Sequence, residues 1–401
     1  MFKFKGYEEC FICLLSFMIF YVIWSIFQSN GDITPETQTK NILIWNENQF
    51  LRHLYEQYPI SKLQCQSNNC LITEKKYYFF SDYQRFDAII FSFPPHPYPY
   101  NLATLDVPDN RSKSQVYIFF TIESAFNVPA CELYFDDFFN WTFTSRLDSD
   151  IVWKYFVVQN ITGHEVAPSV NVNWEVSNEP VSSKVKMNWE HRTKAAAWLV
   201  SNCESDNFRN VYVTKLQENL IHFSLKIDVY GHCNNVECPN EDCDSMLSRE
   251  YYFYLAFENS FSDDYVTEKV LHGYNNYVVP IVFGSSNYTR FLPPGSYINA
   301  REYHPYHLAF LINEAMTDHS KYEKYFTWTN SYTIVRSTPK YNDLCSLCDA
   351  LNSEKAKHAP VYKNLRLWWN KPSGMKWCLS NEFFNETTLE NTNTNHLFQL
   401  Y

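Results

Sequence analysis

Residues 251–284 constrain the fold of this chain more than any other stretch. They read YYFYLAFENSFSDDYVTEKVLHGYNNYVVPIVFG, in which the apolar runs 251–257 and 277–283 enclose a dense polar block. Such runs are typical of buried parallel strands, and the triplet TEK at 267–269 is a helix-start signal. The segment therefore predicts a strand, loop, helix and strand unit, whose loop and helix N-terminus favour an anionic ligand.

Strand-like runs recur elsewhere at the spacing of an α/β protein. They lie at residues 42–45, 88–93, 116–121, 196–200, 227–230, 251–257 and 278–283, with helices expected at 210–222, 267–274 and 307–317. Because a polar connector near residues 176–192 separates two groups of runs, we expect two Rossmann-like domains facing a central cleft. The chain has eight glycines but no GxGxxG or Walker loop, which excludes the usual dinucleotide and P-loop sites.

The composition is that of a folded protein without a nucleic-acid surface. A length of 401 residues suits two domains, since a domain usually takes about 100–200 residues. The residues are 45% hydrophobic and only 19% charged, which is too apolar for a disordered chain. The formal net charge of −11 argues against a nucleic-acid partner, because phosphate backbones are bound by clustered Lys and Arg. Any phosphate site must therefore be local.

An uncharged apolar run lies near the N-terminus. Residues 11–27 read FICLLSFMIFYVIWSIF, and a helix of this length just reaches the short end of membrane-spanning length. The run is long for a cleaved signal peptide and lacks a small-residue cleavage site, so we expect a transmembrane signal-anchor. Two lysines precede it, which predicts a cytoplasmic tail at residues 1–10 and a lumenal remainder, although two glutamates weaken that signal. Residues 28–40 read as a polar stem.

Lumenal placement carries two further expectations. N-glycosylation is expected at the sequons of Asn110, Asn140, Asn160, Asn287 and Asn385. The chain has twelve cysteines, which in an oxidising compartment indicate disulfides rather than free thiols. His232 with Cys233, Cys238 and Cys243 could also suggest a zinc site, but the same oxidising compartment favours disulfides there.

The polar block and three other stretches resemble the α1,3/4-fucosyltransferases, glycosyltransferase family 10. The block supplies FYLAFENS, DY, TEK and VPIVFG in the family order, and the other stretches are FFNWTFTSRLDSDI, WLVSN followed by Arg209, and NYTRFLPPGSYI. The resemblance covers roughly residues 41–348. It implies a GT-B type fold, with an N-terminal acceptor-side domain at 41–190 and a C-terminal GDP-fucose-binding domain at 191–353. A C-terminal extension, residues 354–401, matches no pattern.

The resemblance implies a donor site for GDP-fucose. The residues that match donor-contacting positions of the family are Ser201, Asn202, Arg209, Asn259, Tyr265, Glu268 and Lys269. Arg209 offers bidentate hydrogen bonds to a diphosphate, and Lys269 at a helix start opposes the helix dipole unless an anion lies nearby. Without the family match, both would be interpreted as surface or ion-paired cations. Glu258 beside them could simply cap or pair within the turn.

Glu123, in the run TIES, is the candidate general base. It follows the predicted strand 116–121, and residues at the carboxyl ends of parallel strands face the crevice of the sheet. The resemblance aligns it with the glutamate that the family uses on the acceptor side. The alternative is a glutamate on an exposed loop. With such a base the implied reaction is a single inverting displacement without a covalent enzyme intermediate.

Asp148 and Asp150 form a DxD triplet, which in another glycosyltransferase architecture holds Mn²⁺ on the diphosphate. Because the triplet lies in the first domain, inside a family block, we interpret it as structural. The resemblance implies no metal site and no obligatory cofactor, although a divalent cation could be stimulatory. It also implies disulfides Cys65–Cys345 and Cys70–Cys348, which would clamp the two domains. The pairing of the other lumenal cysteines stays open.

The resemblance thus predicts an α1,3-fucosyltransferase that transfers L-fucose from GDP-β-L-fucose to N-acetylglucosamine of glycoprotein or glycolipid glycans, as a single-pass type II protein of the Golgi membrane. Core α1,3-fucosylation of the proximal N-glycan N-acetylglucosamine is one alternative, because Phe91, Ser92 and Phe93 replace a His-His pair and the Trp or Arg after it. The other is a non-catalytic lumenal glycan-binding protein. The intact set of Glu123, Arg209, Glu268 and Lys269 argues against the latter.

Overall fold

The computed structural model describes residues 38–94, 107–175, 177, 179–239, 242–336, 342–371 and 378. The predicted cytoplasmic tail, the signal-anchor at 11–27, most of the stem and most of the C-terminal extension lie outside these residues. In the described part of the chain, none of the helices combines the length and apolarity that a bilayer crossing needs.

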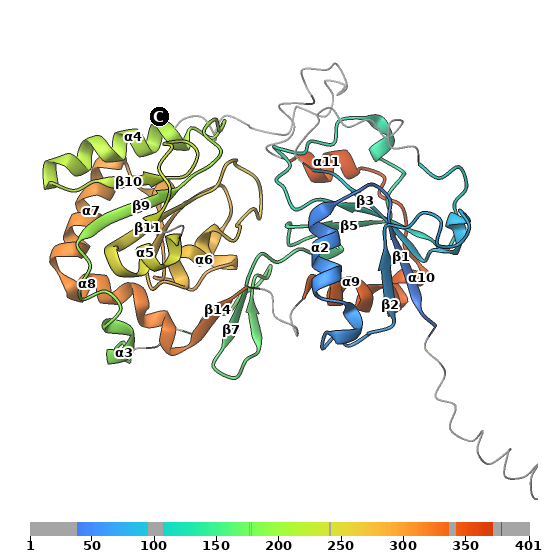
Figure 1. Ribbon diagram of the computed structural model, residues 1–401, viewed down its shortest axis with the longest axis horizontal. Coiled ribbons are helices and arrows are strands. Elements are labelled where there is room, and N and C mark those ends of the chain that lie inside the picture. Colours follow the sequence, from blue (N-terminus) through green and yellow to red (C-terminus); the bar gives the residue numbers. More distant parts are fainter. Residues whose placement is uncertain are drawn as a thin grey trace, which may run out of the picture. The chain divides into compact units, whose positions relative to one another are not determined.

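The first sheet consists of parallel strands in the order β2-β1-β3-β4-β5-β6. These are β1 (Lys40–Ile44), β2 (Cys70–Thr73), β3 (Ala88–Ser92), β4 (Val116–Phe120), β5 (Trp141–Thr144) and β6 (Ile151–Val152). Helices α2 (Gln49–Gln57) and α9 (Asp343–Asn352) pack on one face, and α11 (Leu365–Asn370) packs on the other (Figure 1). Burial on both faces explains why β3 and β4 are continuous apolar runs.

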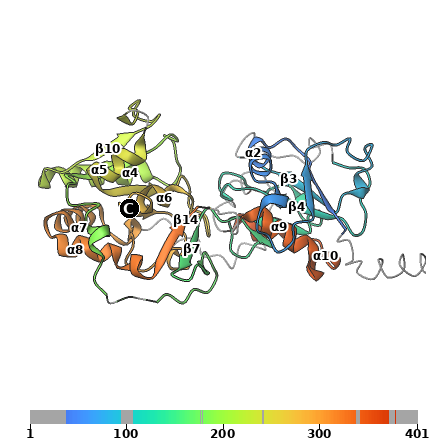
Figure 2. The same ribbon diagram turned by 60° about the horizontal axis from the view of Figure 1, so that its bottom comes forward.

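The second sheet is also parallel, in the order β10-β9-β11-β12-β13. Its strands are β9 (Lys194–Leu199), β10 (Ile227–Tyr230), β11 (Tyr251–Phe257), β12 (Val279–Phe283) and β13 (Ile298–Asn299). Helices α4 (Arg209–Leu220), α7 (Pro305–Thr317) and α8 (His319–Glu323) cover one face, and α5 (Cys243–Glu250) and α6 (Lys269–Tyr274) cover the other (Figures 1 and 2). The α/β class is therefore confirmed, with helices on both faces of each sheet.

Two segments pack differently from their predicted domain. Helix α9 was expected in the second domain, but Leu347 and Leu351 pack against the first sheet. Strands β7 (Val157–Asn160) and β8 (Glu165–Ala167) were expected in the first domain, but they pair with β14 (Tyr332–Val335) in a small antiparallel sheet. This sheet shares an apolar cluster with α5 and α6. Burial of apolar side chains, rather than sequence order, thus decides where these segments lie.

Two predicted helices begin at other residues than expected. Helix α6 starts at Lys269 and not at 267, and the backbone N–H of Thr267, just before it, donates to the Glu258 carboxylate at 2.8 Å. Helix α7 starts at Pro305, earlier than predicted, because His304 accepts from the backbone N–H of Tyr306 and proline suits a first helical turn.

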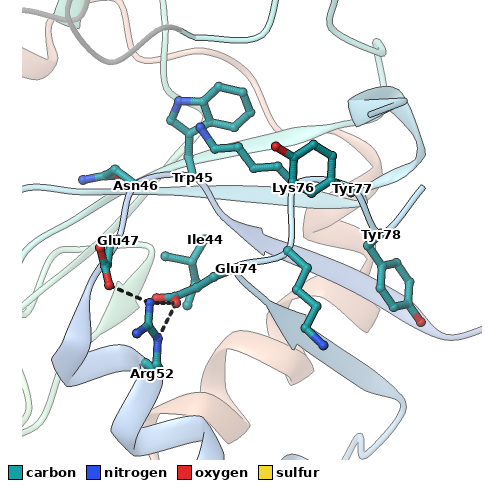
Figure 3. A pocket seen from close by; sticks show the side chains of 10 residues that line it. Ile44, Trp45, Asn46, Glu47, Arg52, Glu74, Lys76, Tyr77 and Tyr78 are labelled. Carbon is teal, nitrogen blue, oxygen red and sulfur yellow. Dashed lines mark hydrogen bonds and ion pairs between the residues drawn. The ribbon is translucent and has the colours of Figure 1, made fainter. Parts of the chain in front are cut away.

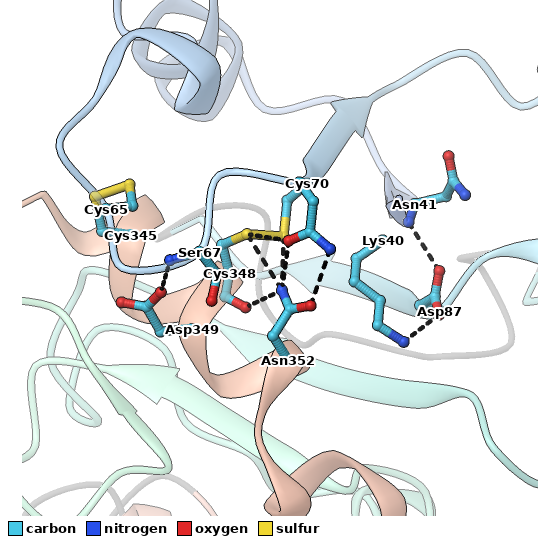
Figure 4. Close-up of a disulfide and its surroundings, with 11 residues drawn as sticks. Lys40, Asn41, Cys65, Ser67, Cys70, Asp87, Cys345, Cys348, Asp349 and Asn352 are labelled. Carbon is cyan, nitrogen blue, oxygen red and sulfur yellow. Dashed lines mark hydrogen bonds and ion pairs between the residues drawn. A yellow bond between two sulfur atoms is a disulfide. The ribbon is translucent and has the colours of Figure 1, made fainter. Parts of the chain in front are cut away.

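Disulfides tie α9 to the first sheet. Cys65–Cys345 and Cys70–Cys348 are the two pairs that the family resemblance implied, and Figure 4 shows both beside the start of β2. Cys65 lies on the loop before β2 and Cys70 is the first residue of β2, while α9 itself packs on the first sheet. Both bridges therefore stay within the first domain, and the expectation that they clamp the two domains was wrong. The pairs that the sequence left open are Cys131–Cys378, Cys203–Cys233 and Cys238–Cys243. The suspected zinc cluster therefore consists of disulfide-bonded cysteines.

Candidate functional site

The loops after β4, β9 and β11 carry the predicted site residues. Parallel strands expose their following loops at one edge, which is why residues distant in sequence can meet there. Two hydrogen bonds join the loop after β4 to the loop after β11. Tyr265 Oη donates to Glu123 Oε2 at 3.1 Å, and Ser260 Oγ donates to Ser124 Oγ at 2.7 Å. The loop predicted to carry the base thus contacts the loop predicted to bind the donor.

The carboxylate of Glu123 is partly buried and held from two sides. Besides Tyr265, it accepts a hydrogen bond from Asn127 Nδ2 at 3.1 Å. Burial, followed by the charges of nearby groups that include Glu123, raises the pKa of Tyr265 well above its usual value. Tyr265 therefore stays a neutral phenol that can donate to the carboxylate.

Glu258 and Lys269 form a buried ion pair. Glu258 is 1% exposed, and its carboxylate accepts from Lys269 Nζ at 2.9 Å and from both donors of Thr267. Burial opposes the charge of Lys269, but the charges of Glu258 and Glu268 outweigh it and raise the pKa of that lysine. The capping role expected of Glu258 is present, and Lys269 is held beside it as a cation.

Arg209, the first residue of α4, is buried and joins two loops. Its Nη1 donates to the carbonyl of Phe257 at 2.9 Å and its Nη2 to the carbonyl of Asn202 at 2.6 Å. Nε is buried and has no hydrogen-bond partner among the described residues. Burial lowers the pKa of Arg209 from its ordinary value. These hydrogen bonds, which join the segments that follow β9 and end β11, were not predicted from the sequence.

The remaining predicted donor residues lie on the loops after β9 and β11. Ser201 and Asn202 are exposed after β9, whereas Asn259 and Glu268 are half-buried on the loop after β11. Ser201 also lines a pocket of about 380 Å³ at the ends of β9 and β10, together with Tyr230 and Gly231. The charge of Glu268 acts on Lys269, but no hydrogen bond among the described residues joins Ser201 or Glu268 to that lysine. The donor roles of these residues stay predictions.

Two residues that support the site were not predicted as such. Tyr155 donates to the carbonyl of Ile122, and its ring lies 6.3 Å from that of Tyr265. Asp264 accepts from the backbone N–H of Leu147 at 3.1 Å and from Arg290 at 2.8 Å. Burial raises the pKa of Asp264, and the residue adopts a φ of 55°. Aspartate is among the residues that tolerate a left-handed backbone best, so an aspartate in a loop is a weak sign of such a turn.

The Asp148 and Asp150 side chains make internal contacts. Asp148 pairs with Arg146 at 2.9 Å and accepts from Trp368 Nε1 at 3.0 Å. Asp150 accepts from Tyr362 Oη at 2.8 Å and pairs with Lys355 at 2.7 Å. Within the described residues, no group of three or more His, Cys, Asp or Glu side chains is arranged to hold a metal ion. These aspartates thus bind the C-terminal segment to the first sheet.

One predicted glycosylation site does not fit the structure. The Asn140 side chain is buried, accepts from the backbone N–H of Tyr117 and donates to the carbonyl of Ala359. A glycan on this nitrogen would displace the bond to Ala359, so the expectation at Asn140 is corrected. Asn110 and Asn287 are exposed and Asn160 is half-buried. Asn385 lies outside the described residues.

Two parallel sheets with site loops at their carboxyl ends define the class as an α/β transferase of the GT-B-like kind. A crystal structure of α1,3-fucosyltransferase with GDP-fucose has this fold, with a TM-score of 0.50 and 14% identity, over 83% of this chain and 95% of that one. At that identity the similarity shows the fold alone.

Two sequence families cover most of the described chain. Residues 37–156 match "Fucosyltransferase, N-terminal", and residues 189–368 match "Glycosyltransferase family 10 (fucosyltransferase) C-term". The chain is 36% identical over 321 residues to α-(1,3)-fucosyltransferase C of Drosophila melanogaster, which covers 77% of this chain and 71% of that protein. It is 34% identical over 259 residues to 4-galactosyl-N-acetylglucosaminide 3-α-L-fucosyltransferase FUT5 of Gorilla gorilla gorilla, covering 64% of this chain and 62% of that protein. The chain belongs to glycosyltransferase family 10, the fucosyltransferases, which confirms the predicted family and enzyme class.

Proposed function

We propose that this protein transfers L-fucose from GDP-β-L-fucose, with inversion, in α1,3 linkage to N-acetylglucosamine of glycoprotein or glycolipid glycans. The names of its relatives support the donor and the linkage. The proposal includes a Golgi location with a type II signal-anchor at residues 11–27, supported by the apolar run there and by the disulfides of the described chain.

The contact between Tyr265 and Glu123 carries this proposal. It places a carboxylate from the loop after β4 against the loop that also holds Glu258, Glu268 and Lys269. Fucosyl transfer requires a base for the acceptor hydroxyl and positive charge for the leaving diphosphate. A binding module would need neither the buried ion pair nor the oriented carboxylate.

Each step of the proposed reaction can be assigned to one or more of these residues. Glu123 takes the proton of the acceptor hydroxyl, whose oxygen forms the new bond to the anomeric carbon of fucose. The bond from that carbon to the diphosphate oxygen breaks, and its electron pair leaves with GDP. Lys269 and Arg209 supply positive charge for the diphosphate, with Ser201, Asn202, Asn259, Tyr265 and Glu268 as further donor contacts. No obligatory metal is invoked.

Transfer by the full-length chain, expressed where its disulfides can form, tests the function. Labelled GDP-fucose is compared with GDP-mannose and UDP-galactose, each offered with N-acetyllactosamine, Lewis-type and N-glycan core acceptors. We expect transfer from GDP-fucose alone, and the panel identifies the acceptor. GDP binding without transfer to any acceptor would instead support a non-catalytic glycan-binding protein.

Glu123→Gln tests the base. We expect GDP affinity to be retained while turnover falls at least about 100-fold, because proton transfer contributes that much or more. Calorimetry with GDP and steady-state assays measure the two effects. Glu190→Gln, at an exposed glutamate before β9, is the matched control. Unchanged turnover in Glu123→Gln would remove Glu123 from the mechanism.

A further inference from the structure

A second pocket lies on the first sheet, at the ends of β1 and β2. It has a volume of about 750 Å³, and its lining residues end or follow β1, follow β2 or lie on α2 (Figure 3). They are Ile44, Trp45, Asn46, Glu47, Arg52, Glu74, Lys75, Lys76, Tyr77 and Tyr78. None of the residues given a donor or base role belongs to this set.

The pocket combines aromatic surface with polar groups at its rim. Tyr77 is 82% exposed and Tyr78 is 47% exposed. Both tyrosines line the hollow, so their rings are open to a ligand in it. Lys76 extends over the Trp45 ring, with Nζ 3.7 Å from the ring centroid, as Figure 3 shows. Aromatic faces beside side chains that donate and accept hydrogen bonds suit the apolar and hydroxyl faces of a sugar.

The lining of the pocket carries charges of both signs. Arg52 pairs with Glu47 at 2.9 Å and also with Glu74 (Figure 3). Lys75 and Lys76 add two further cations to this lining. Ammonium groups donate hydrogen bonds and carboxylates accept them, which suits a ligand rich in hydroxyl groups.

A row of hydrogen bonds connects this pocket to the proposed base. Asn46 exchanges two bonds with Ser92 at the end of β3, and Phe93 N–H donates to the carbonyl of Phe120 at the end of β4. Glu123 follows three residues after β4 ends. Since β1 is two strands from β4, the pocket begins on the order of 10 Å from the base, given a strand spacing of about 4.8 Å. A short oligosaccharide spans such a distance.

We propose that this pocket is a subsite for an oligosaccharide, binding the sugars that precede the fucosylated residue in the acceptor. This inference rests on the proposed fucosyl transfer and gives it a preference for extended acceptors. Tyr77 supplies a stacking face, and the exposed carboxylate of Glu47 supplies an acceptor for sugar hydroxyls.

Direct binding tests the subsite independently of catalysis. Saturation-transfer NMR on the full-length chain with GDP compares a disaccharide of N-acetyllactosamine with a linear tetrasaccharide of two such units. We expect the tetrasaccharide to bind at least about tenfold more tightly, and Tyr77→Ala to remove most of that advantage. Glu47→Ala should reduce it as well. Tyr306→Ala, at a half-exposed tyrosine on α7 that is no part of the lining, is the matched control.

Transfer kinetics supply the second readout. With GDP-fucose, the ratio of kcat/KM for the tetrasaccharide to that for the disaccharide should fall about tenfold in Tyr77→Ala and stay constant in Tyr306→Ala. Equal binding of the two glycans by the unmodified chain would overturn the subsite. If the chain transfers no fucose but the tetrasaccharide binds through Tyr77, the proposed function fails while the saccharide site stands.

Discussion

Lys269 has two roles that mutation can separate, because its partner Glu258 is almost fully buried. The lysine neutralises a carboxylate that is 1% exposed, and we assign it to the donor diphosphate as well. Lys269→Met should lower the free energy of unfolding by about 3 kcal/mol, since it leaves an uncompensated buried charge. It should also weaken GDP binding at least about tenfold. Urea unfolding and calorimetry with GDP measure the two losses.

The double variant Lys269→Met/Glu258→Gln distinguishes the two roles. The amide of glutamine still accepts from the backbone N–H of Thr267 but carries no charge, so most of the lost stability should return. GDP affinity should stay low, because no cation replaces Lys269. Recovery of GDP binding in the double variant would show that Lys269 serves stability alone.

At the scale of elements, Gly284, the residue directly after β12, allows a close approach between neighbouring segments. A methyl group added at Gly284 would lie 2.6 Å from Tyr288 Oη and 3.6 Å from Glu258 Cγ. The hydroxyl of Tyr288 is buried and has no hydrogen-bond partner among the described residues. The glycine is thus needed for close approach beside the donor loop, and not for an unusual φ.

Gly284→Ala should therefore destabilise the protein by about 1–3 kcal/mol through overpacking. Tyr288→Phe should be close to neutral, because the hydroxyl that it removes makes no described hydrogen bond. In the double variant the phenyl ring leaves room for the methyl group, so stability should return toward that of the unmodified chain. Thermal unfolding of the three variants checks this; purely additive losses would mean that backbone strain, rather than the hydroxyl, causes the defect.

Strands were predictable where burial on both faces requires a continuous run of apolar residues. Strands β10 and β11 have the predicted bounds, and β3 and β4 end one residue earlier than predicted. The short strands β6 and β13 carry too few residues for any pattern. The sequence also predicted which residues form the donor block, a prediction that the structure does not test, but it did not predict their contacts. Arg209 bonds backbone carbonyls that become neighbours only after the sheet forms, and so its bracing role could not be read from spacing.

At the scale of the whole molecule, the chain returns to the first sheet after completing the second. Helix α9 covers one face, and α11 fills the other with Leu365 and Trp369. Arg366 pairs with Asp136 at 2.7 Å, and Cys378 is bonded to Cys131. The first sheet is therefore completed by residues from far later in the sequence, such as Arg366, which lies 230 positions after its partner Asp136. No local pattern in the sequence predicts such a return.

Asp343, the first residue of α9, should make the free energy of unfolding depend on pH. Its carboxyl is buried and accepts from the backbone N–H of Lys154 at 3.1 Å, and burial raises the pKa of Asp343 to about 8. The folded protein holds this proton at pH values where the unfolded chain, with an aspartate pKa of about 3.9, has lost it. Stability from this group is therefore full below about pH 4 and declines as the pH rises toward about 8, by up to about 1.4 kcal/mol for each pH unit.

Asp343→Asn should remove this dependence, because the amide keeps the acceptor for Lys154 and cannot ionise. Between about pH 5 and pH 8, the free energy of unfolding of the unmodified chain should fall more steeply than that of the variant. Urea unfolding across that range measures both slopes, with Asp109→Asn, at an exposed aspartate, as the control. Parallel profiles for the unmodified chain and Asp343→Asn would mean that Asp343 is ionised in the folded protein. In that case the positive charge of Lys154 and the N-terminal end of α9 would compensate the burial of the carboxylate. Asp343 would then add no pH dependence to the free energy of unfolding.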